Sequence, residues 1–165
     1  MTQCYFFAGG RRLIITDNVL DTFRKYGQGD PARSEAGGVL LGRHLLESPD
    51  IVIDEATLPQ TTDRRSRFSF FRSEAHCSIA TRRWEESRGK VAYVGLWHSH
   101  PEAIPTPSGT DLNDWRQALR QDVYEGDYLF FIIVGTQELG CWSGRRWGPL
   151  SKITKLLPQA TPISE

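Results

Sequence analysis

Hydrophobic positions along this chain switch repeatedly between the two-residue period of strands and the wider spacing of amphipathic helices. The strand-like segments are residues 13–16, 35–42, 51–58, 91–100, 128–134 and 138–143. The helix-like segments are residues 17–26, 73–88 and 108–121, with Ser73 as the expected N-cap of the second. We expect residues 51–58 to pair antiparallel with the glycine-rich segment 35–42, residues 59–67 to form a mobile loop, and residues 68–71 to form a short apolar patch. This order of elements predicts an α/β fold with a mixed β-sheet and flanking helices.

Composition indicates the number of domains, the kinds of partner and the cellular setting to expect. The chain has 165 residues, 39% of them hydrophobic, which predicts a single domain over residues 1–157 followed by a polar tail at residues 158–165. Its 20 basic and 20 acidic residues cancel, so we expect no nucleic-acid partner. The 3 cysteines form no C-x-x-C pair, which fits a reducing, cytoplasmic setting. Every apolar run is far shorter than the roughly 20 residues that span a bilayer, so we expect no membrane association.

The clearest candidate chemistry is the sequence His98-Ser99-His100, followed after seven residues by Ser108 and after two more by Asp111. Because side chains at positions i and i+2 of a strand share a face, His98 and His100 are expected side by side where the strand ends. The proline-containing segment 101–107 predicts a loop that can return Asp111 to the imidazoles. Two imidazoles and a carboxylate leave a fourth coordination position open, which is typical of catalytic zinc.

The same residues also fit structural roles that involve no metal. A single histidine is more often a hydrogen-bonded core residue than a ligand, although two at this spacing before an aspartate favour a metal. Ser108 and Asp111 also fit a capping box, in which Ser108 caps the helix at 108–121 and Asp111 reaches back to the cap. Ser108 could serve as the cap and still donate to a reaction intermediate. His44 and His76 have no partner at ligand spacing and are expected at ordinary surface or amphipathic positions.

A metal-dependent hydrolase also needs a carboxylate that takes and returns a proton. Glu35, at the start of the glycine-rich segment, is the best candidate, although no sequence pattern places it near His98. Glu102 is closer to the histidines in sequence, but it is expected to be a solvent-exposed loop residue.

Two other enzyme classes are disfavoured. Residues 100–102 match the H-x-E motif of nucleobase deaminases, but the P-C-x-x-C motif that accompanies it is absent. A thiol enzyme needs an activated cysteine, and nothing near Cys77 or Cys141 indicates one.

Three motifs together resemble the JAMM (MPN-domain) metalloproteases. They are E-x-G-G-x-L-L-G at residues 35–42, G-L-W-H-S-H-P at residues 95–101 and P-S-x-x-D-L at residues 107–112. The resemblance spans about residues 13–143, and the compact chain is most similar to small bacterial members of the family. It implies an MPN-like fold with a cytidine-deaminase-like core.

The resemblance also implies a role for each motif residue. His98, His100 and Asp111 match the family's ligands and are expected to bind one zinc per chain. Glu35 matches the general acid/base that holds the zinc-activated water, and Ser108 matches the residue that steadies the oxyanion.

The activity implied is that of a zinc-dependent isopeptidase or peptidase that cuts after the C-terminal residue of a ubiquitin-like protein or another conjugated protein tail. The segment 59–71 is the candidate flap that holds this tail by strand addition, with a plain surface loop as the alternative. Small bacterial members act in antiviral defence systems or in sulfur-carrier pathways, and the sequence does not choose between them. A tail-binding or scaffold module that keeps the fold and metal without cleaving is the alternative function. Glu35 and Ser108 favour the enzyme, because binding alone needs neither.

Overall fold

The structure is a computed structural model that describes residues 2–27, 29–30 and 32–157. Within this part of the chain the helices are α1 (Asp17–Tyr26), α2 (Ala75–Glu86) and α3 (Gly109–Gln121). The strands are β1 (Gln3–Phe7), β2 (Arg11–Ile15), β3 (Gly37–His44), β4 (Ile51–Ala56), β5 (Arg64–Ser66), β6 (Ser69–Phe71), β7 (Ala92–Ser99), β8 (Tyr128–Val134), β9 (Leu139–Arg145), β10 (Leu150–Lys152) and β11 (Thr154–Lys155). The tail predicted at residues 158–165 lies outside the described residues, so its boundary stays a prediction.

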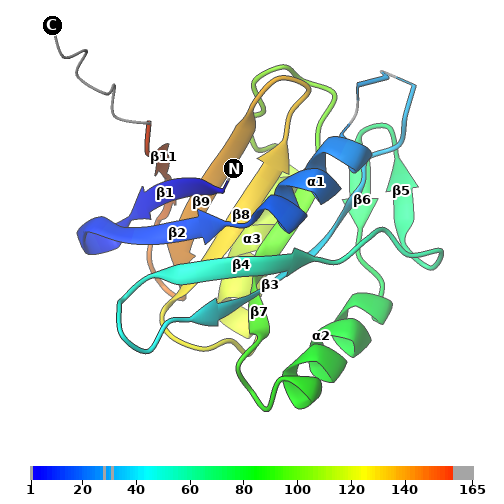
Figure 1. Cartoon of the computed structure of the whole chain (residues 1–165). Helices are drawn as coiled ribbons and strands as arrows, with labels where there is room; N and C mark the ends of the chain where they lie inside the picture. Colours follow the sequence, from blue (N-terminus) through cyan, green and yellow to red (C-terminus); the bar gives the residue numbers. More distant parts are fainter. Residues whose placement is uncertain (1, 28, 31, 158–165) are drawn as a thin grey trace, which may run out of the picture.

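One mixed sheet organises the domain. Among the described residues, nine strands form it in the order β10-β9-β8-β7-β3-β4-β2-β1-β11, and β5 and β6 form a separate hairpin. Helix α1 covers one face of the sheet and α3 the other, while α2 packs beside β3 and β7 (Figure 1). The expected single-domain α/β fold with a mixed sheet and flanking helices is therefore confirmed, as is the antiparallel pairing of β3 with β4.

The central strands divide their side chains between two cores, because successive residues of a strand point to opposite faces. In β8, Phe130, Ile132 and Val134 join the core under α1, whereas Leu129, Phe131 and Ile133 join the core under α3. In β7 the alternation is interrupted by a register shift against β3 near Val94, so Val94 joins the core under α1 but Leu96 joins the core under α3. The Trp97 ring packs 5.2 Å from that of Phe23 in α1, and the next side chain, His98, faces α3.

Strand β7 lies at the centre of the sheet, parallel to β8 and antiparallel to β3. Its register with β3 places Gly37 opposite His98. Gly95 allows the close approach to β8, because a Cβ atom there would lie 1.8 Å from the carbonyl oxygen of Phe130. This glycine therefore helps to fix the strand that ends between the two histidines.

The segment 59–71 differs from the prediction of a mobile loop followed by an apolar patch. Its second half is an antiparallel hairpin in which Arg64 pairs with Phe71 and Ser66 with Ser69. The β5 side chains are all exposed, so the strand lacks the alternation by which a half-buried strand is recognised. The Arg64 guanidinium lies 5.2 Å from the centre of the Phe71 ring and covers part of it.

The start of α2 was also predicted wrongly. The helix begins at Ala75, and Glu74 is its N-cap without a side-chain hydrogen bond. Ser73 lies one residue before the cap and bonds to the preceding loop instead: its backbone N–H donates to Asp63 at 2.8 Å, and its hydroxyl accepts from Thr62 at 2.7 Å.

Several strands were missed or misplaced. The short strands β1, β10 and β11 were not predicted, and all three lie toward the edges of the sheet. Strand β3 begins at Gly37 and not at Glu35, so Glu35 lies on the segment that leads into the strand.

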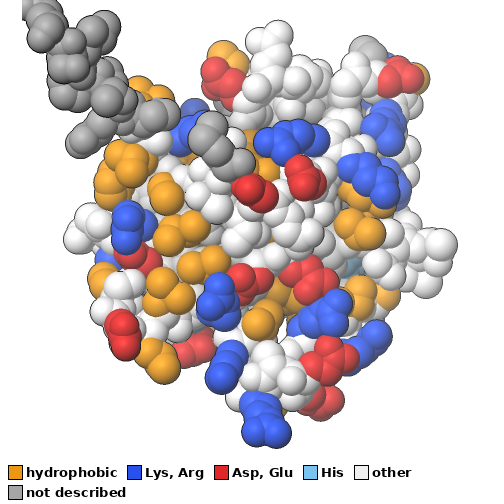
Figure 2. All heavy atoms as spheres, viewed as in Figure 1, with side chains coloured by type: hydrophobic (Ala, Val, Ile, Leu, Met, Phe, Trp, Pro, Cys, Tyr) orange, Lys and Arg blue, Asp and Glu red, His pale blue; other side chains and the backbone are white. Residues whose placement is uncertain are grey.

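The surface carries charges of both signs. On the face shown in Figure 2, acidic and basic side chains are interspersed, and neither sign forms a broad field. No helix of the described residues is long and apolar enough to cross a membrane.

We predict that Gly95→Ala lowers the free energy of unfolding by more than about 2 kcal/mol, because the new methyl group would meet backbone and not a movable side chain. Gly29→Ala is the matched control, since a Cβ there meets nothing within 4 Å, and it should change the free energy by less than about 0.5 kcal/mol. Urea unfolding of both variants measures the difference. Equal effects would show that the β7–β8 approach does not constrain this position.

Candidate metal centre

His98 lies near the end of β7 and His100 directly follows the strand, both on the face of the sheet that α3 covers. Both side chains are buried, His98 at 4% exposure and His100 at 7%. The Ser99 side chain points to the opposite face of the sheet. Its hydroxyl accepts a hydrogen bond from the backbone N–H of Ala36 at 2.9 Å, which extends the contact between β7 and the segment before β3. The backbone N–H of Ser99 donates to the Ala36 carbonyl at 2.8 Å. These two bonds hold the end of β7 against the segment that contains Glu35.

The Asp111 carboxylate lies close to both imidazoles. Its Oδ1 atom lies 3.2 Å from His98 Nε2, its Oδ2 atom lies 3.1 Å from His100 Nε2, and the two Nε2 atoms are 3.0 Å apart. Two ligands of a tetrahedral zinc are about 3.3 Å apart when each bond is about 2.0 Å long. The three groups therefore converge at a spacing that fits a single zinc ion.

The first turn of α3 fixes the Asp111 carboxylate. Ser108 and Asp111 form a capping box, in which the Ser108 hydroxyl accepts from the Asp111 N–H at 3.1 Å and Asp111 Oδ2 accepts from the Ser108 N–H at 2.8 Å. The capping interpretation is thus confirmed, but it does not compete with metal binding. The same carboxylate that caps the helix is directed at the two histidines.

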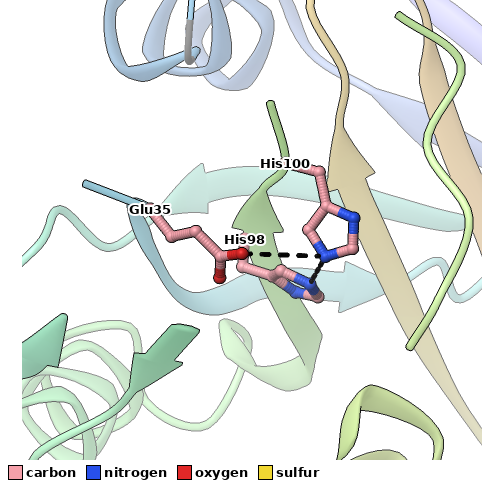
Figure 3. A group of neighbouring side chains, drawn as sticks. All are labelled: Glu35, His98 and His100. Atoms are coloured by element: carbon pink, nitrogen blue, oxygen red, sulfur yellow. Dashed lines mark hydrogen bonds and ion pairs between the residues drawn. The ribbon is translucent and has the colours of Figure 1, made fainter. Parts of the chain in front are cut away.

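Glu35 approaches the histidines from the segment before β3. Figure 3 shows its side chain converging with those of His98 and His100, and Glu35 Oε1 lies 3.9 Å from His100 Nε2. These three residues are buried and could hold a metal ion. The Asp111 carboxylate is nearer to the imidazoles than the Glu35 carboxylate is. Asp111 therefore fits the third ligand position better, and Glu35 fits a position next to the ligands but outside direct bonding distance of an ion.

The β5–β6 hairpin holds the backbone of Glu35. The Glu35 N–H donates to the Ser66 carbonyl at 2.7 Å, and Arg65 Nε donates to the Glu35 carbonyl at 2.8 Å. These contacts were not predicted, because the sequence indicated only a mobile loop over residues 59–67. They fix the segment before β3 although it belongs to no regular element.

The electrostatics of the cluster follow from burial and pairing. Burial raises the pKa of the Glu35 carboxyl to about 7 and lowers the pKa of His98. Burial acts to raise the pKa of Asp111, but hydrogen bonds from His100 and His98 lower it well below its ordinary value. For His100, burial acts to lower the pKa, but the Asp111 carboxylate raises it. A neutral His98 and an ionised Asp111 are the forms in which these groups bind metal.

Glu102 is an exposed loop residue, as expected. Its Oε1 atom lies 3.6 Å from His100 Nδ1, which is too far for a hydrogen bond, and its Oε2 atom accepts from the Thr106 N–H at 3.1 Å. Glu102 therefore lies outside the cluster of ligand atoms.

The position of His76 differs from the prediction. It was expected at a surface or amphipathic position, but it is 1% exposed. Its Nδ1 atom lies 2.7 Å from the Thr57 hydroxyl and its Nε2 atom 2.9 Å from Asp63. No sequence pattern indicated this network, because both partners come from segments outside the helix that carries His76.

Neither Cys77 nor Cys141 lies where it could act as a nucleophile in this site. Burial raises the pKa of the Cys141 thiol to about 12, and Cys77 is exposed on α2. Neither side chain lies in the cluster of histidines and carboxylates, so a thiol nucleophile remains disfavoured.

Comparison with known proteins gives one consistent result. The family model for prokaryotic homologs of the JAB domain matches residues 16–147, which include Glu35 and every residue of the histidine cluster. A Pseudomonas aeruginosa protein named CD-NTase/cGAS isopeptidase is 39% identical over 130 residues, covering 77% of this chain and 79% of that protein. A Vibrio cholerae protein of the same name is 29% identical over 144 residues, covering 87% of each.

A solved structure supports the fold. A protein from Desulfitobacterium hafniense, determined in solution, superposes with a TM-score of 0.57 at 18% identity, covering 84% of this chain and 87% of that one. The family match confirms the resemblance to the JAMM (MPN-domain) proteins that the three motifs indicated. The chain belongs to the family of prokaryotic homologs of the JAB domain.

Proposed function

We propose that this protein is a zinc-dependent isopeptidase of the JAMM type. The observation that carries the proposal is the convergence of His98, His100 and Asp111 at 3.0–3.2 Å, with the buried Glu35 carboxylate 3.9 Å from His100. Membership of the JAB family and relatives named isopeptidases support a hydrolase of this class.

His98, His100 and Asp111 would hold one zinc ion per chain through the Nε2 atoms and the carboxylate. When bound, zinc would polarise the scissile carbonyl and make an attacking water a stronger nucleophile. The capping box and the burial of both imidazoles keep these three side chains in place before any ion binds.

Glu35 is the proposed general acid/base. Its carboxylate takes a proton from the attacking water and returns it to the nitrogen of the leaving amine. Burial acts to raise the pKa of Glu35, which favours return of the proton to the leaving amine. A divalent cation nearby would favour the ionised form, in which Glu35 is ready to act as the base.

Ser108 is the proposed oxyanion donor. Its hydroxyl oxygen already accepts the Asp111 N–H, so its own proton remains available for the oxygen that becomes negative in the transition state. Its position as the N-cap fixes the hydroxyl at the start of α3.

The proposed substrate is the C-terminal tail of a CD-NTase/cGAS-type or ubiquitin-like protein, joined through its last residue to an amine. The names of the relatives support a CD-NTase/cGAS-type partner, and such a partner would place the protein in antiviral defence. Strand β6 pairs with β5 on one side and has no second neighbouring strand among the described residues. Its open edge could hold an extended tail by strand addition.

Asp111→Asn separates the metal role from the capping role. The asparagine oxygen can still accept the Ser108 N–H, so α3 should stay capped and the far-ultraviolet circular dichroism should not change. Zinc measured after dialysis should fall well below one equivalent per chain. Full zinc retention would assign the third ligand position to another group, with Glu35 first.

Glu35→Gln should keep the zinc and the fold but lose turnover by roughly 10²–10⁴-fold, the usual contribution of a general acid–base group. Glu102→Gln is the matched comparison and should lose far less. Turnover and zinc content are measured on the same samples. A Glu35→Gln variant that cuts normally would transfer the proton role to another residue, and one that loses zinc would make Glu35 a ligand.

The activity itself is tested with a fusion of the C-terminal tail of a CD-NTase/cGAS-type protein from the same genome to a reporter amine. The zinc-loaded protein should cut after the last residue of the tail, as mapped by mass spectrometry, and a chelator should stop the reaction. Chelator-insensitive cutting, or cutting elsewhere, contradicts the assignment. Zinc-loaded protein that binds the tail without cutting it would support the non-cleaving module.

A further inference from the structure

Arg72 is a largely buried cation beside this site. It directly follows β6, and its side chain is 14% exposed. Its Nε donates to the carbonyl of Gly38 at 2.7 Å, one terminal nitrogen donates to the carbonyl of Trp97 at 2.8 Å, and the other lies 3.3 Å from the Asp114 carboxylate. One guanidinium thus contacts three separate elements, β3, β7 and α3.

Each of these elements carries one part of the proposed active site. Gly38 lies three residues after Glu35, Trp97 directly precedes His98, and Asp114 lies about one helical turn after Asp111. Gly38 and Trp97 are also cross-strand partners in the β3–β7 ladder. Arg72 therefore links the three elements, β3, β7 and α3, that bring the proposed proton shuttle and metal ligands together.

The hairpin keeps Arg72 in place. The centre of the Phe70 ring lies 5.4 Å from the guanidinium carbon. The same ring fills the space over Gly37, where a Cβ atom would lie 2.7 Å from Phe70 Cδ1. The guanidinium is therefore packed between the hairpin and the start of β3.

The chemistry of the contacts suits arginine and not lysine. A guanidinium presents five donors in a rigid planar fork, whereas an ammonium group is a single point with a flexible stem. A lysine at position 72 would donate from a single nitrogen atom, so it could not hold two carbonyls and a carboxylate in the geometry that the planar fork fixes. The burial of a charge at this junction is costly, and the three acceptors offset that cost.

We propose that Arg72 is a positioning residue, which sets the spacing between Glu35 on one side and His98, His100 and Asp111 on the other. The proposal rests on the proposed isopeptidase function. It assigns Arg72 no contact with substrate or zinc; each of its three guanidinium nitrogens already has a partner in Gly38, Trp97 or Asp114.

The test compares Arg72→Lys and Arg72→Gln with two controls. Arg83→Gln removes an exposed arginine of α2 that pairs with Glu55 and Glu86. Val19→Ala destabilises the core under α1, where Val19 is 0% exposed, without touching the site. Each variant is assayed for kcat and KM at saturating zinc, for the visible spectrum of its Co²⁺-substituted form, and for its unfolding temperature.

Arg72→Lys should lower kcat by about 10- to 100-fold with little change in KM, because displacing a catalytic group by about 1 Å costs up to about 10²-fold. Its Co²⁺ spectrum should differ from that of the wild type, since the ligands are no longer held in the same geometry. Both controls should keep the wild-type kcat and spectrum, even where Val19→Ala unfolds at as low a temperature as Arg72→Lys. If Arg72→Gln does not fold, Arg72→Lys alone decides the comparison.

A folded Arg72→Lys protein with a wild-type kcat and spectrum would overturn the proposal, and so would equal losses in Val19→Ala. Failure of the proposed function is a separate outcome. If the wild-type protein cuts no tail, the Co²⁺ spectrum of Arg72→Lys still tests whether Arg72 positions the metal ligands.

Discussion

The backbone ladder between β3 and β7 brings together two halves of a site that lie far apart in the sequence. Its register places Gly37 opposite His98 and so brings Glu35, just before the strand, to the end of β7. A slip of one residue would turn His98 and His100 to the α1 face, because strand side chains alternate. Ser99 bonds to Ala36 at the end of this ladder, and Arg72 bonds to both strands beside it.

Local structure around the ladder positions the two acidic residues of the site. The capping box at the start of α3 orients Asp111, and the β5–β6 hairpin holds the backbone of Glu35. Hydrogen bonds that involve main-chain groups therefore hold both Asp111 and Glu35 close to the histidines. Burial and pairing then set their charge states, because burial raises the pKa of Glu35, while the imidazoles lower that of Asp111. Two carboxylates in one site acquire different chemistry from their surroundings.

How much of the site could be predicted depended on how far apart its members are in the sequence. His98 lies near the end of a strand, His100 directly follows it, and Asp111 comes after one short loop, so a period of two residues and a turn indicated that the three side chains could meet. Glu35 was placed only by family resemblance, since its position depends on a strand pairing that no local pattern encodes. Arg65 and Arg72 were missed for the same reason, because charged residues in a polar run carry no periodicity. His76 was misplaced because its burial depends on Thr57 and Asp63, which reach it only in the folded chain.

The most direct test of the proposed metal centre is a crystal structure of the zinc-loaded protein, with the ion located by anomalous scattering at the zinc edge. We expect a single ion within about 2.0–2.2 Å of His98 Nε2, His100 Nε2 and an Asp111 oxygen, with Glu35 outside direct bonding distance. An ion bound by Glu35 in place of Asp111, or an ion elsewhere on the chain, would contradict this arrangement.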